Sequence, residues 1–412
     1  MSNSLTTEVE SKIIYIENGS VTTAKGFQAS GIHCGLKKRN KDLALIYSVI
    51  PAESAGVYTL NKAAAAPVTI SKNITNNNSM VKAIICNSGN ANACTGVDGH
   101  LDALAVQKSC AEVLGINQNE VLVSSTGVIG LKLNVDAIKN SLPQLKENLS
   151  DDGGILAAEA IMTTDLVSKN FAVKVELSKG EIIIGGIAKG SGMIMPNMAT
   201  MLGFVTTDAK ISKSLLQSAL TEAVNDSYNK ISVDGETSTN DMVLLLANGS
   251  SNVEVLENSN DYQLFVSALK DISIKMAKSI VADGEGATKF ITLNIINAPT
   301  EKDANIIAKA IANSPLVKTA INGGDPNWGR VISAASSSGA NILPEKVTLY
   351  FDDLVLMSPN YKINDVEKEA AKILENKEIT IILDLNDGNA NTTWWTCDYS
   401  EQYIKINAHY RT

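Results

Sequence analysis

The sequence has few histidines and few cysteines, the residues that most often bind zinc or build a histidine-based or cysteine-based catalytic site. It contains three histidines in 412 residues, and none of them forms an HxxxH or HExxH pattern. Neither a histidine-ligated metal site nor a Ser-His-Asp triad is therefore expected. The five cysteines are scattered without CxxC spacing, which is typical of reduced thiols in a cytosol. We expect no metal, and a catalyst that supplies its own base.

Positive charge and long apolar runs are also scarce. The net charge of -9 argues against nucleic acid or an anionic membrane as a partner. No apolar run approaches the roughly 18 residues that a membrane-spanning helix needs. Residues 1–11 show neither the apolar core of a secretory signal nor the arginine-rich pattern of a transit peptide, so a cytoplasmic location is expected. The composition is typical of a globular protein, and the length suffices for two packed units.

Short apolar segments and amphipathic segments alternate along the chain without a regular period. Strands are predicted at 43–47, 55–59, 66–70, 81–86, 121–125, 181–187, 201–205, 242–247, 347–351 and 379–385. Helices are predicted at 101–114, 154–162, 214–228, 264–281, 306–321 and 366–374. Since the strands follow one another without regular βαβ spacing, the pattern favours an α+β fold, a layered sandwich, over a doubly wound sheet.

The segment KGSGMIMPNMATMLGFVTTDA, residues 189–209, combines a glycine-rich loop with an apolar strand. Ala199 and Thr200 lie at the junction, where a self-cleaving precursor would place its scissile bond. Thr200 would attack the carbonyl of Ala199, and the resulting ester would hydrolyse. The new N-terminal threonine would then hold a nucleophile and its base in one residue. On chemistry alone, the more ordinary interpretation of the same residues is a glycine-rich surface loop that leads into a strand.

Two loops that follow predicted strands are candidates for the rest of the site. Thr126 and Gly127 could present a hydroxyl and a backbone N–H to a developing oxyanion, or form a plain strand-end turn. The loop at 87–96 is rich in asparagine and glycine, which suits either ligand binding or a structural cluster of Asx turns. Cys94 in this loop has no histidine nearby, and we interpret it as a small buried residue.

Two charged residues suit the recognition of an amino acid. Lys189 lies in GGIAKGSG, which lacks the Gly-Lys-Ser/Thr order of a phosphate loop, so nucleotide binding is rejected. Lys189 could instead neutralise a substrate carboxylate, or simply be an exposed solubilising lysine. Glu285 stands between two glycines and could bind a substrate ammonium, or lie in a solvated turn.

Residues 189–209 resemble the self-cleavage segment of the ornithine acetyltransferases, the glutamate N-acetyltransferases of arginine biosynthesis, and similar blocks recur across nearly the whole chain. The resemblance implies an N-terminal-nucleophile-like fold of the DmpA and ornithine acetyltransferase type, with sheets flanked by helices. It implies cleavage between Ala199 and Thr200 into an α chain, residues 1–199, and a β chain, residues 200–412. Two such pairs are expected to assemble as an α2β2 heterotetramer.

The resemblance also implies roles for individual residues. Thr200 would be the nucleophile, and Thr126 with Gly127 would form the oxyanion hole. The implied substrate-binding residues are Thr163, Lys189, Thr200, Glu285, Asn407 and Thr412. The chain departs from the family pattern at 166–168, where another threonine is common, and at His409, where an acidic residue is common.

The implied reaction transfers the acetyl group of N2-acetyl-L-ornithine to L-glutamate through an acetyl-Thr200 intermediate, giving L-ornithine and N-acetyl-L-glutamate. No cofactor is required in this scheme, and no motif reports whether acetyl-CoA serves as an alternative donor. The partners are then the small-molecule substrates and the sister chains. The alternative is an N-terminal-threonine amidase or aminopeptidase that passes the acyl group to water, and release of acetate without glutamate would identify it.

Overall fold

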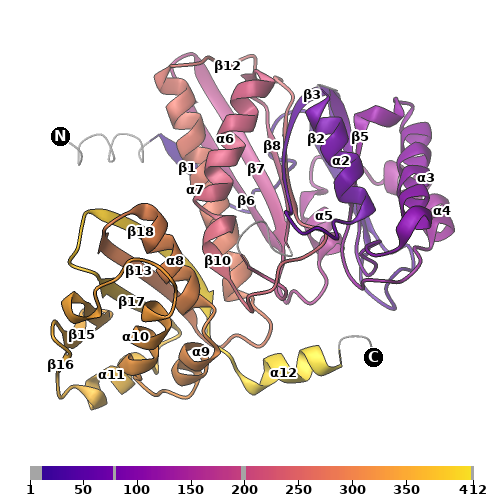
Figure 1. Cartoon of the computed structure of the whole chain (residues 1–412). Coiled ribbons are helices and arrows are strands. Elements are labelled where there is room, and N and C mark those ends of the chain that lie inside the picture. The colour runs from indigo at the N-terminus through magenta and orange to yellow at the C-terminus, as the bar shows by residue number, and fades with distance from the viewer. Residues whose placement is uncertain (1–11, 78–79, 196–200, 410–412) are drawn as a thin grey trace. The chain divides into compact units, whose positions relative to one another are not determined.

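The computed structural model describes residues 12–77, 80–195 and 201–409 (Figure 1). The chain divides into two compact units. The first comprises Met1–Gly190, Asn197–Asn229 and Glu236–Ile280, and the second comprises Ser191–Pro196, Lys230–Gly235 and Val281–Thr412. In the described ranges, every helix is too short or too polar to span a lipid bilayer.

The first unit is built on a nine-stranded sheet with the order β1-β6-β7-β8-β11-β3-β4-β5, in which β2 also pairs with β3. Its strands are β1 Ile13–Ile16, β2 Phe27–Ile32, β3 Leu43–Tyr58, β4 Val81–Asn87, β5 Val121–Ser125, β6 Lys169–Leu177, β7 Gly180–Lys189, β8 Leu202–Thr207 and β11 Met242–Ala247. Every residue of β8 and β11 is buried, as expected for strands in the middle of a covered sheet. A short parallel pair, β9 Lys210–Ile211 and β12 Glu254–Val255, lies outside this sheet.

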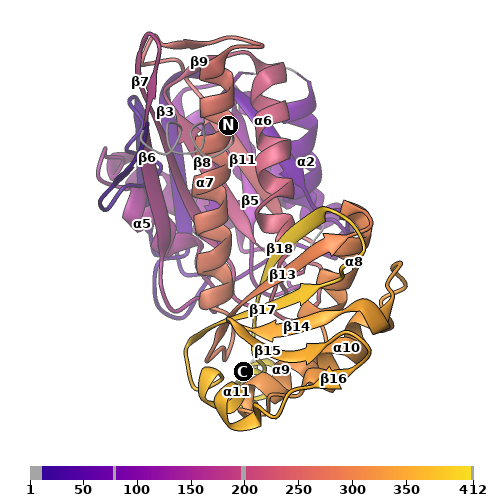
Figure 2. The same ribbon diagram turned by 90° about the vertical axis from the view of Figure 1, so that its left-hand side faces the viewer.

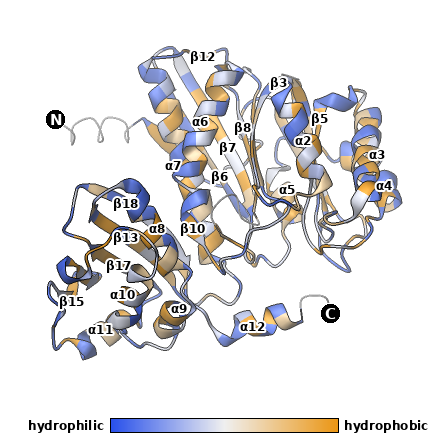
Figure 3. Ribbon diagram, in the orientation of Figure 1, coloured by the Kyte–Doolittle hydropathy of each residue, from blue (hydrophilic) through white to orange (hydrophobic). Residues whose placement is uncertain are grey.

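Helices cover the sheet of the first unit. They are α2 Ala66–Asn76, α3 Gly96–Leu114, α4 Val135–Glu147, α5 Gly154–Ile161, α6 Lys213–Asn225 and α7 Asn260–Ala282. Helix α5 packs on β2 and β3, α6 packs on β3, and α7 lies over β7 (Figure 2). Hydrophobic and hydrophilic residues alternate around α6 and α7 in Figure 3, so each helix has an apolar side available for packing.

The second unit has a seven-stranded sheet with the order β10-β18-β13-β17-β14-β15-β16. Its strands are β10 Ile231–Ser232, β13 Phe290–Ala298, β14 Thr348–Phe351, β15 Leu354–Ser358, β16 Lys362–Ile363, β17 Glu378–Asp384 and β18 Ala390–Cys397. Its helices are α8 Glu301–Ala312, α9 Pro315–Asn322, α10 Trp328–Ser336, α11 Glu367–Ile373 and α12 Glu401–Ala408. Helix α8 packs on β13 and β18 and closes the core of this unit.

The predicted α+β class, with sheets flanked by helices, is confirmed, and three local predictions are wrong. The two strands predicted at 43–47 and 55–59 are one continuous strand, β3. The strand predicted at 66–70 is the start of helix α2, because Pro67 occupies the first turn, where its missing N–H costs nothing. The helix predicted at 306–321 is two helices, α8 and α9. Ser314 caps α9 by accepting a hydrogen bond from the Val317 N–H, and Pro315 begins the new helix.

Candidate functional site

The end of strand β5 is held rigidly by the asparagine-rich loop that follows β4. The Thr126 N–H donates to the Asn87 carbonyl at 2.9 Å, and the Ser125 hydroxyl donates to Asn87 Oδ1 at 2.6 Å. Gly127 has a φ of +129°, and a Cβ there would lie 2.4 Å from the carbonyl carbon of Gly89. Only glycine fits this approach, so the Thr126–Gly127 turn has a single well-defined backbone position.

A second connection ties this turn to the segment before β11. The Asn240 side-chain amide donates to the Ala91 carbonyl at 2.6 Å and to the Ser125 carbonyl at 2.8 Å. Asn240 is itself buried, so both bonds are shielded from water. Within the loop at 87–96, Asn90 Oδ1 accepts a hydrogen bond from the Asn92 N–H at 2.8 Å, which is an Asx turn. These bonds together fix the backbone beside Thr126.

Lys189, the last residue of β7, lies beside two of the predicted site threonines. It is 2% exposed, so it is not a solubilising surface lysine. Its Nζ donates to Thr163 Oγ1 at 2.8 Å and to Thr126 Oγ1 at 3.4 Å. The structure thus brings together Thr126, Thr163 and Lys189 from three separate stretches of the first unit.

The carboxylate of Asp165 organises the cations around this cluster. Its Oδ1 accepts hydrogen bonds from Lys169 Nζ at 2.8 Å and from the Gly190 N–H at 2.7 Å, and its Oδ2 accepts from the Thr163 N–H at 3.0 Å. Burial raises the pKa of Asp165, but the charges of Lys189 and Lys169 outweigh burial and lower the pKa to about 2. No motif in the sequence indicated Lys169, although it lies four residues after Asp165.

Lys189 itself is under opposing electrostatic influences. Burial lowers the pKa of its ammonium, and Asp165 raises it in turn. The positive charge of Lys169 lowers the pKa of Lys189 further, and the buried Asp241 raises it. The side chains of Lys169, Lys189 and Asp165 are all nearly or completely buried.

The start of strand β8 is held by a buried acid. Asp241 Oδ1 accepts a hydrogen bond from the Met201 N–H at 2.9 Å, one residue before the β8–β11 pairing begins. Burial raises the pKa of Asp241 well above its ordinary value, against the opposing effects of the Met201 N–H and the Lys189 charge. Ala199 and Thr200, the predicted cleavage residues, lie outside the described residues, so their predicted roles stay predictions.

Glu285 and Asn407 form the corresponding pair in the second unit. Glu285 is 7% exposed, which excludes a solvated turn, and its Oε2 accepts a hydrogen bond from Asn407 Nδ2 at 2.8 Å. A Cβ on Gly192 would lie 2.3 Å from Glu285 Oε2, so this carboxylate also needs the glycine beside it. Thr412, the third predicted residue of this group, lies outside the described residues.

The prediction that Cys94 is buried is wrong. Its side chain is exposed, and its φ of +56° places it in the left-handed region. The loop at 87–96 turns so tightly that Asn92 also has a positive φ, of +46°. The sequence indicated the turn but not which of its side chains face solvent.

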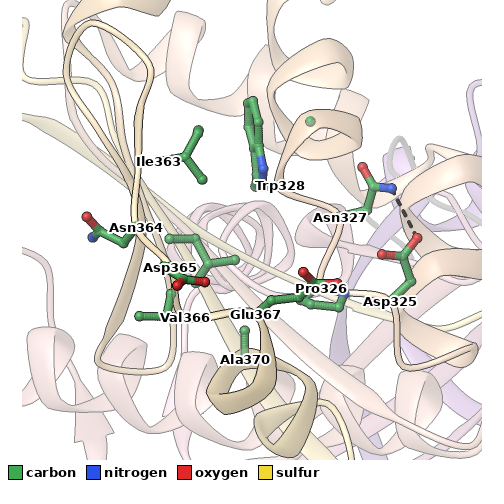
Figure 4. Close-up of a pocket in the computed structure, with 12 residues that line it drawn as sticks. Asp325, Pro326, Asn327, Trp328, Ile363, Asn364, Asp365, Val366, Glu367 and Ala370 are labelled. Carbon is green, nitrogen blue, oxygen red and sulfur yellow. Dashed lines mark hydrogen bonds between the residues drawn. The ribbon is translucent and has the colours of Figure 1, made fainter.

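The second unit also contains an open cavity of about 510 Å³ (Figure 4). Residues 325–329 form one wall, with Trp328 above the cavity and Asp325 accepting a hydrogen bond from Asn327 Nδ2 at 3.0 Å. Residues 363–367 form the facing wall. None of the predicted site residues that the structure describes lines this cavity. Within the described ranges, no group of three or more histidine, cysteine, aspartate or glutamate side chains is placed to hold a metal ion.

Comparison with known proteins gives full-length matches. The profile of the ArgJ family matches residues 28–412. The arginine biosynthesis bifunctional protein ArgJ of Chlorobaculum tepidum is 47% identical over 389 residues, which are 94% of this chain and 96% of the relative. The protein of the same name from Bacillus subtilis is 46% identical over 404 residues, which are 98% of this chain and 99% of the relative.

A solved structure of related sequence is ornithine acetyltransferase from Mycobacterium tuberculosis, crystallised with ornithine. It is 35% identical, covers 45% of this chain and 98% of its own, and superposes with a TM-score of 0.42. The sequence matches span nearly every element of both units, including all the predicted site residues up to the C-terminus. The chain therefore belongs to the ArgJ family, and the resemblance to the ornithine acetyltransferases of arginine biosynthesis is confirmed.

Proposed function

We propose that the protein transfers the acetyl group of N2-acetyl-L-ornithine to L-glutamate through an acetyl-Thr200 intermediate. Membership of the family makes the chain an acetyltransferase of arginine biosynthesis. The observation that carries the finer proposal is the buried Lys189 ammonium with the hydroxyls of Thr126 and Thr163 as its acceptors. This arrangement offers one cation and two hydroxyl donors to a small acylated amino acid.

The hydrogen-bond directions in this cluster suit acyl transfer. Each threonine oxygen accepts from Lys189 and therefore keeps its own hydroxyl proton for a ligand. The Thr126 O–H and the Gly127 N–H would then donate to the oxyanion that forms when the acetyl carbonyl is attacked. Lys189 would bind the α-carboxylate that donor and acceptor share.

The nucleophile in this mechanism is Thr200 with its own α-amine as base. An α-amine has an ordinary pKa of about 7.7–8.0, so a substantial neutral fraction is present at cellular pH to accept the hydroxyl proton. Thr200 Oγ takes the acetyl group, and the α-amino group of ornithine leaves with the proton. The amino group of glutamate then attacks the acetyl ester, which releases N-acetylglutamate and restores the hydroxyl. Two half-reactions of this kind give ping-pong kinetics.

The free amine requires cleavage of the precursor. Thr200 Oγ would attack the carbonyl carbon of Ala199, the peptide nitrogen would leave as the new amine, and water would hydrolyse the ester. The products are an α chain of residues 1–199 and a β chain of residues 200–412, which we propose to assemble in the cytoplasm as an α2β2 heterotetramer. Glu285 would bind a substrate ammonium, Asn407 and Thr412 would complete the substrate contacts, and acetyl-CoA remains an alternative donor to be assayed.

The intact mass under denaturing conditions tests this proposal first. We expect two fragments that meet between Ala199 and Thr200, and acetyl transfer from N2-acetylornithine that depends on glutamate. The Thr200→Ala variant should show one uncut chain and no transfer. A processed and active Thr200→Ala protein would overturn the mechanism, and release of free acetate without glutamate would identify a hydrolase instead.

A further inference from the structure

The loop between β2 and β3 carries a lysine, Lys37, that the mechanism above does not use. Asp42, which is completely buried, holds this loop through its carboxylate. Its Oδ1 accepts from the Cys34 N–H, and its Oδ2 accepts from the Gly35 N–H at 3.2 Å and from the Lys37 N–H at 2.8 Å. Since three backbone donors converge on one carboxylate, the backbone of Lys37 has a fixed position.

The side chain of Lys37 runs toward the cluster around Thr163. Its Cγ would lie 2.8 Å from a Cβ on Gly89, the same glycine that Gly127 approaches closely. Its Nζ donates to the carbonyl of Met162 at 2.9 Å. The ammonium groups of Lys37 and Lys189 therefore contact consecutive residues, Met162 and Thr163, whose Cα atoms are about 3.8 Å apart across a trans peptide.

Charged groups of both signs lie near the ammonium of Lys37. Burial lowers the pKa of the Lys37 ammonium, Asp42 and Asp165 raise it, and the nearby charge of Lys189 lowers it further. Both carboxylate oxygens of Asp42 accept hydrogen bonds from backbone N–H groups. The carboxylate of Asp165 lies within ion-pair distance of both Lys169 and Lys189. Lys37, which is half-buried, and Lys189, which is buried, are thus two neighbouring ammonium groups, and a ligand with two carboxylates would place one beside each.

We propose that Lys37 binds the side-chain carboxylate of the glutamate acceptor and so determines the preference for an acidic acceptor. This inference rests on the proposed function. The donor and the acceptor share an α-carboxylate, for which Lys189 is the proposed partner. They differ at the end of the side chain, where glutamate carries a second carboxylate and N2-acetylornithine carries an ammonium. A lysine beside the Lys189 site therefore distinguishes the acceptor from the donor.

Steady-state kinetics of acetyl transfer test the assignment. In Lys37→Gln the KM for glutamate should rise by about tenfold to a hundredfold, the loss expected for one charge-assisted hydrogen bond. The KM for N2-acetylornithine should change by less than about threefold. The preference for glutamate over glutamine as acceptor, measured as the ratio of their kcat/KM values, should fall by the same factor as kcat/KM for glutamate. The value for glutamine should not change, because its uncharged side chain forms no ion pair with Lys37. Lys37→Arg should keep the glutamate KM within a few-fold of the wild-type value.

Lys38→Gln is the matched control, because it removes a positive charge from the next position of the same loop. It should leave both KM values unchanged. An unchanged glutamate KM in Lys37→Gln, or equal rises in the KM values of donor and acceptor, would overturn the assignment while the transfer reaction stands. If the wild-type protein fails to transfer acetyl groups to glutamate, the proposed function and this inference both fall. If Lys37→Gln does not fold, the KM values of Lys37→Met, which loses the charge, and of Lys37→Arg, which keeps it, are compared instead.

Discussion

The carboxylate of Asp165 and the ammonium of Lys189 lie 3.9 Å apart, with both side chains withdrawn from solvent. Asp165 also binds Lys169 and the backbone of Thr163 and Gly190, so one buried acid joins β6, β7 and the turn at Thr163. The positions of the three proposed ligand-binding groups in the first unit therefore depend on a residue that touches no substrate in the mechanism.

Replacing Asp165 with asparagine should destabilise the protein strongly. The substitution removes a negative charge that pairs with Lys169 and lies beside Lys189, and breaking a buried ion pair in this way costs about 3–5 kcal/mol. The pH dependence of this stabilisation follows from the pKa. Because the folded state lowers the pKa of Asp165 from 3.8 to about 2, the stabilisation is present above pH 3.8 and is lost as pH falls toward 2.

Denaturant unfolding at pH 7 measures the loss of stability in Asp165→Asn. Asp152→Asn, at an exposed aspartate, should change stability by a few tenths of a kcal/mol at most, and similar losses in the two variants would contradict the prediction.

Replacing Lys189 with methionine should weaken both half-reactions together. Donor and acceptor share the α-carboxylate, so kcat/KM should fall by about tenfold or more for N2-acetylornithine and for glutamate alike, as expected when a charge-assisted hydrogen bond is lost. The ion pair between Asp165 and Lys169 remains, which should preserve the fold. Kinetics with each substrate varied in turn measure the effect, and a change confined to one substrate would exclude a shared carboxylate partner.

The sequence predicted helices and strands that follow from a pattern of neighbouring residues. It did not predict contacts between side chains that are far apart in the sequence. The continuous apolar run of β11 predicts its bounds correctly, and Gly115 marks the end of α3 with a φ of +75°. The strand assignment at Pro67 failed because proline suits the first turn of a helix as well as a turn beside a strand. Lys37 was missed because KKRN resembles a solvated charge run, and its burial arises only when the loop folds over Gly89.

Asp241 should make stability depend on pH in the direction opposite to that of Asp165. Burial raises its folded pKa well above 3.8, so its contribution to stability is largest below pH 3.8 and is lost as pH rises toward the folded pKa. In the described part of the chain no donor reaches Oδ2 in good hydrogen-bond geometry, whereas Oδ1 binds the Met201 N–H.

Asp241→Asn keeps an oxygen for Met201 and removes the buried charge. Its melting temperature should therefore equal or exceed that of the wild type at pH 8, and the difference should shrink at pH 5. Asp241→Ala, which loses the hydrogen bond as well, should be less stable than Asp241→Asn by about 1–3 kcal/mol. A wild type clearly more stable than Asp241→Asn at pH 8 would show that the carboxylate is charged and satisfied in the folded state.

Glu285 and Asn407 should act as one unit when a substrate ammonium is bound. The Asn407 amide donates to Glu285 Oε2 at 2.8 Å and so orients the carboxylate. Glu285→Gln should raise the KM for N2-acetylornithine by about tenfold or more, since the charge-assisted contact to the ammonium is lost. Asn407→Ala should raise it less, because the charge stays but its orientation loosens.

Residues that share a hydrogen bond are coupled, so the double variant should cost less than the sum of the single losses, with a coupling of about 0.5–3 kcal/mol. Gln402→Ala, on the exposed side of the same helix α12, is the control and should leave the KM unchanged. Additive effects of the two substitutions would mean that Asn407 does not act through Glu285.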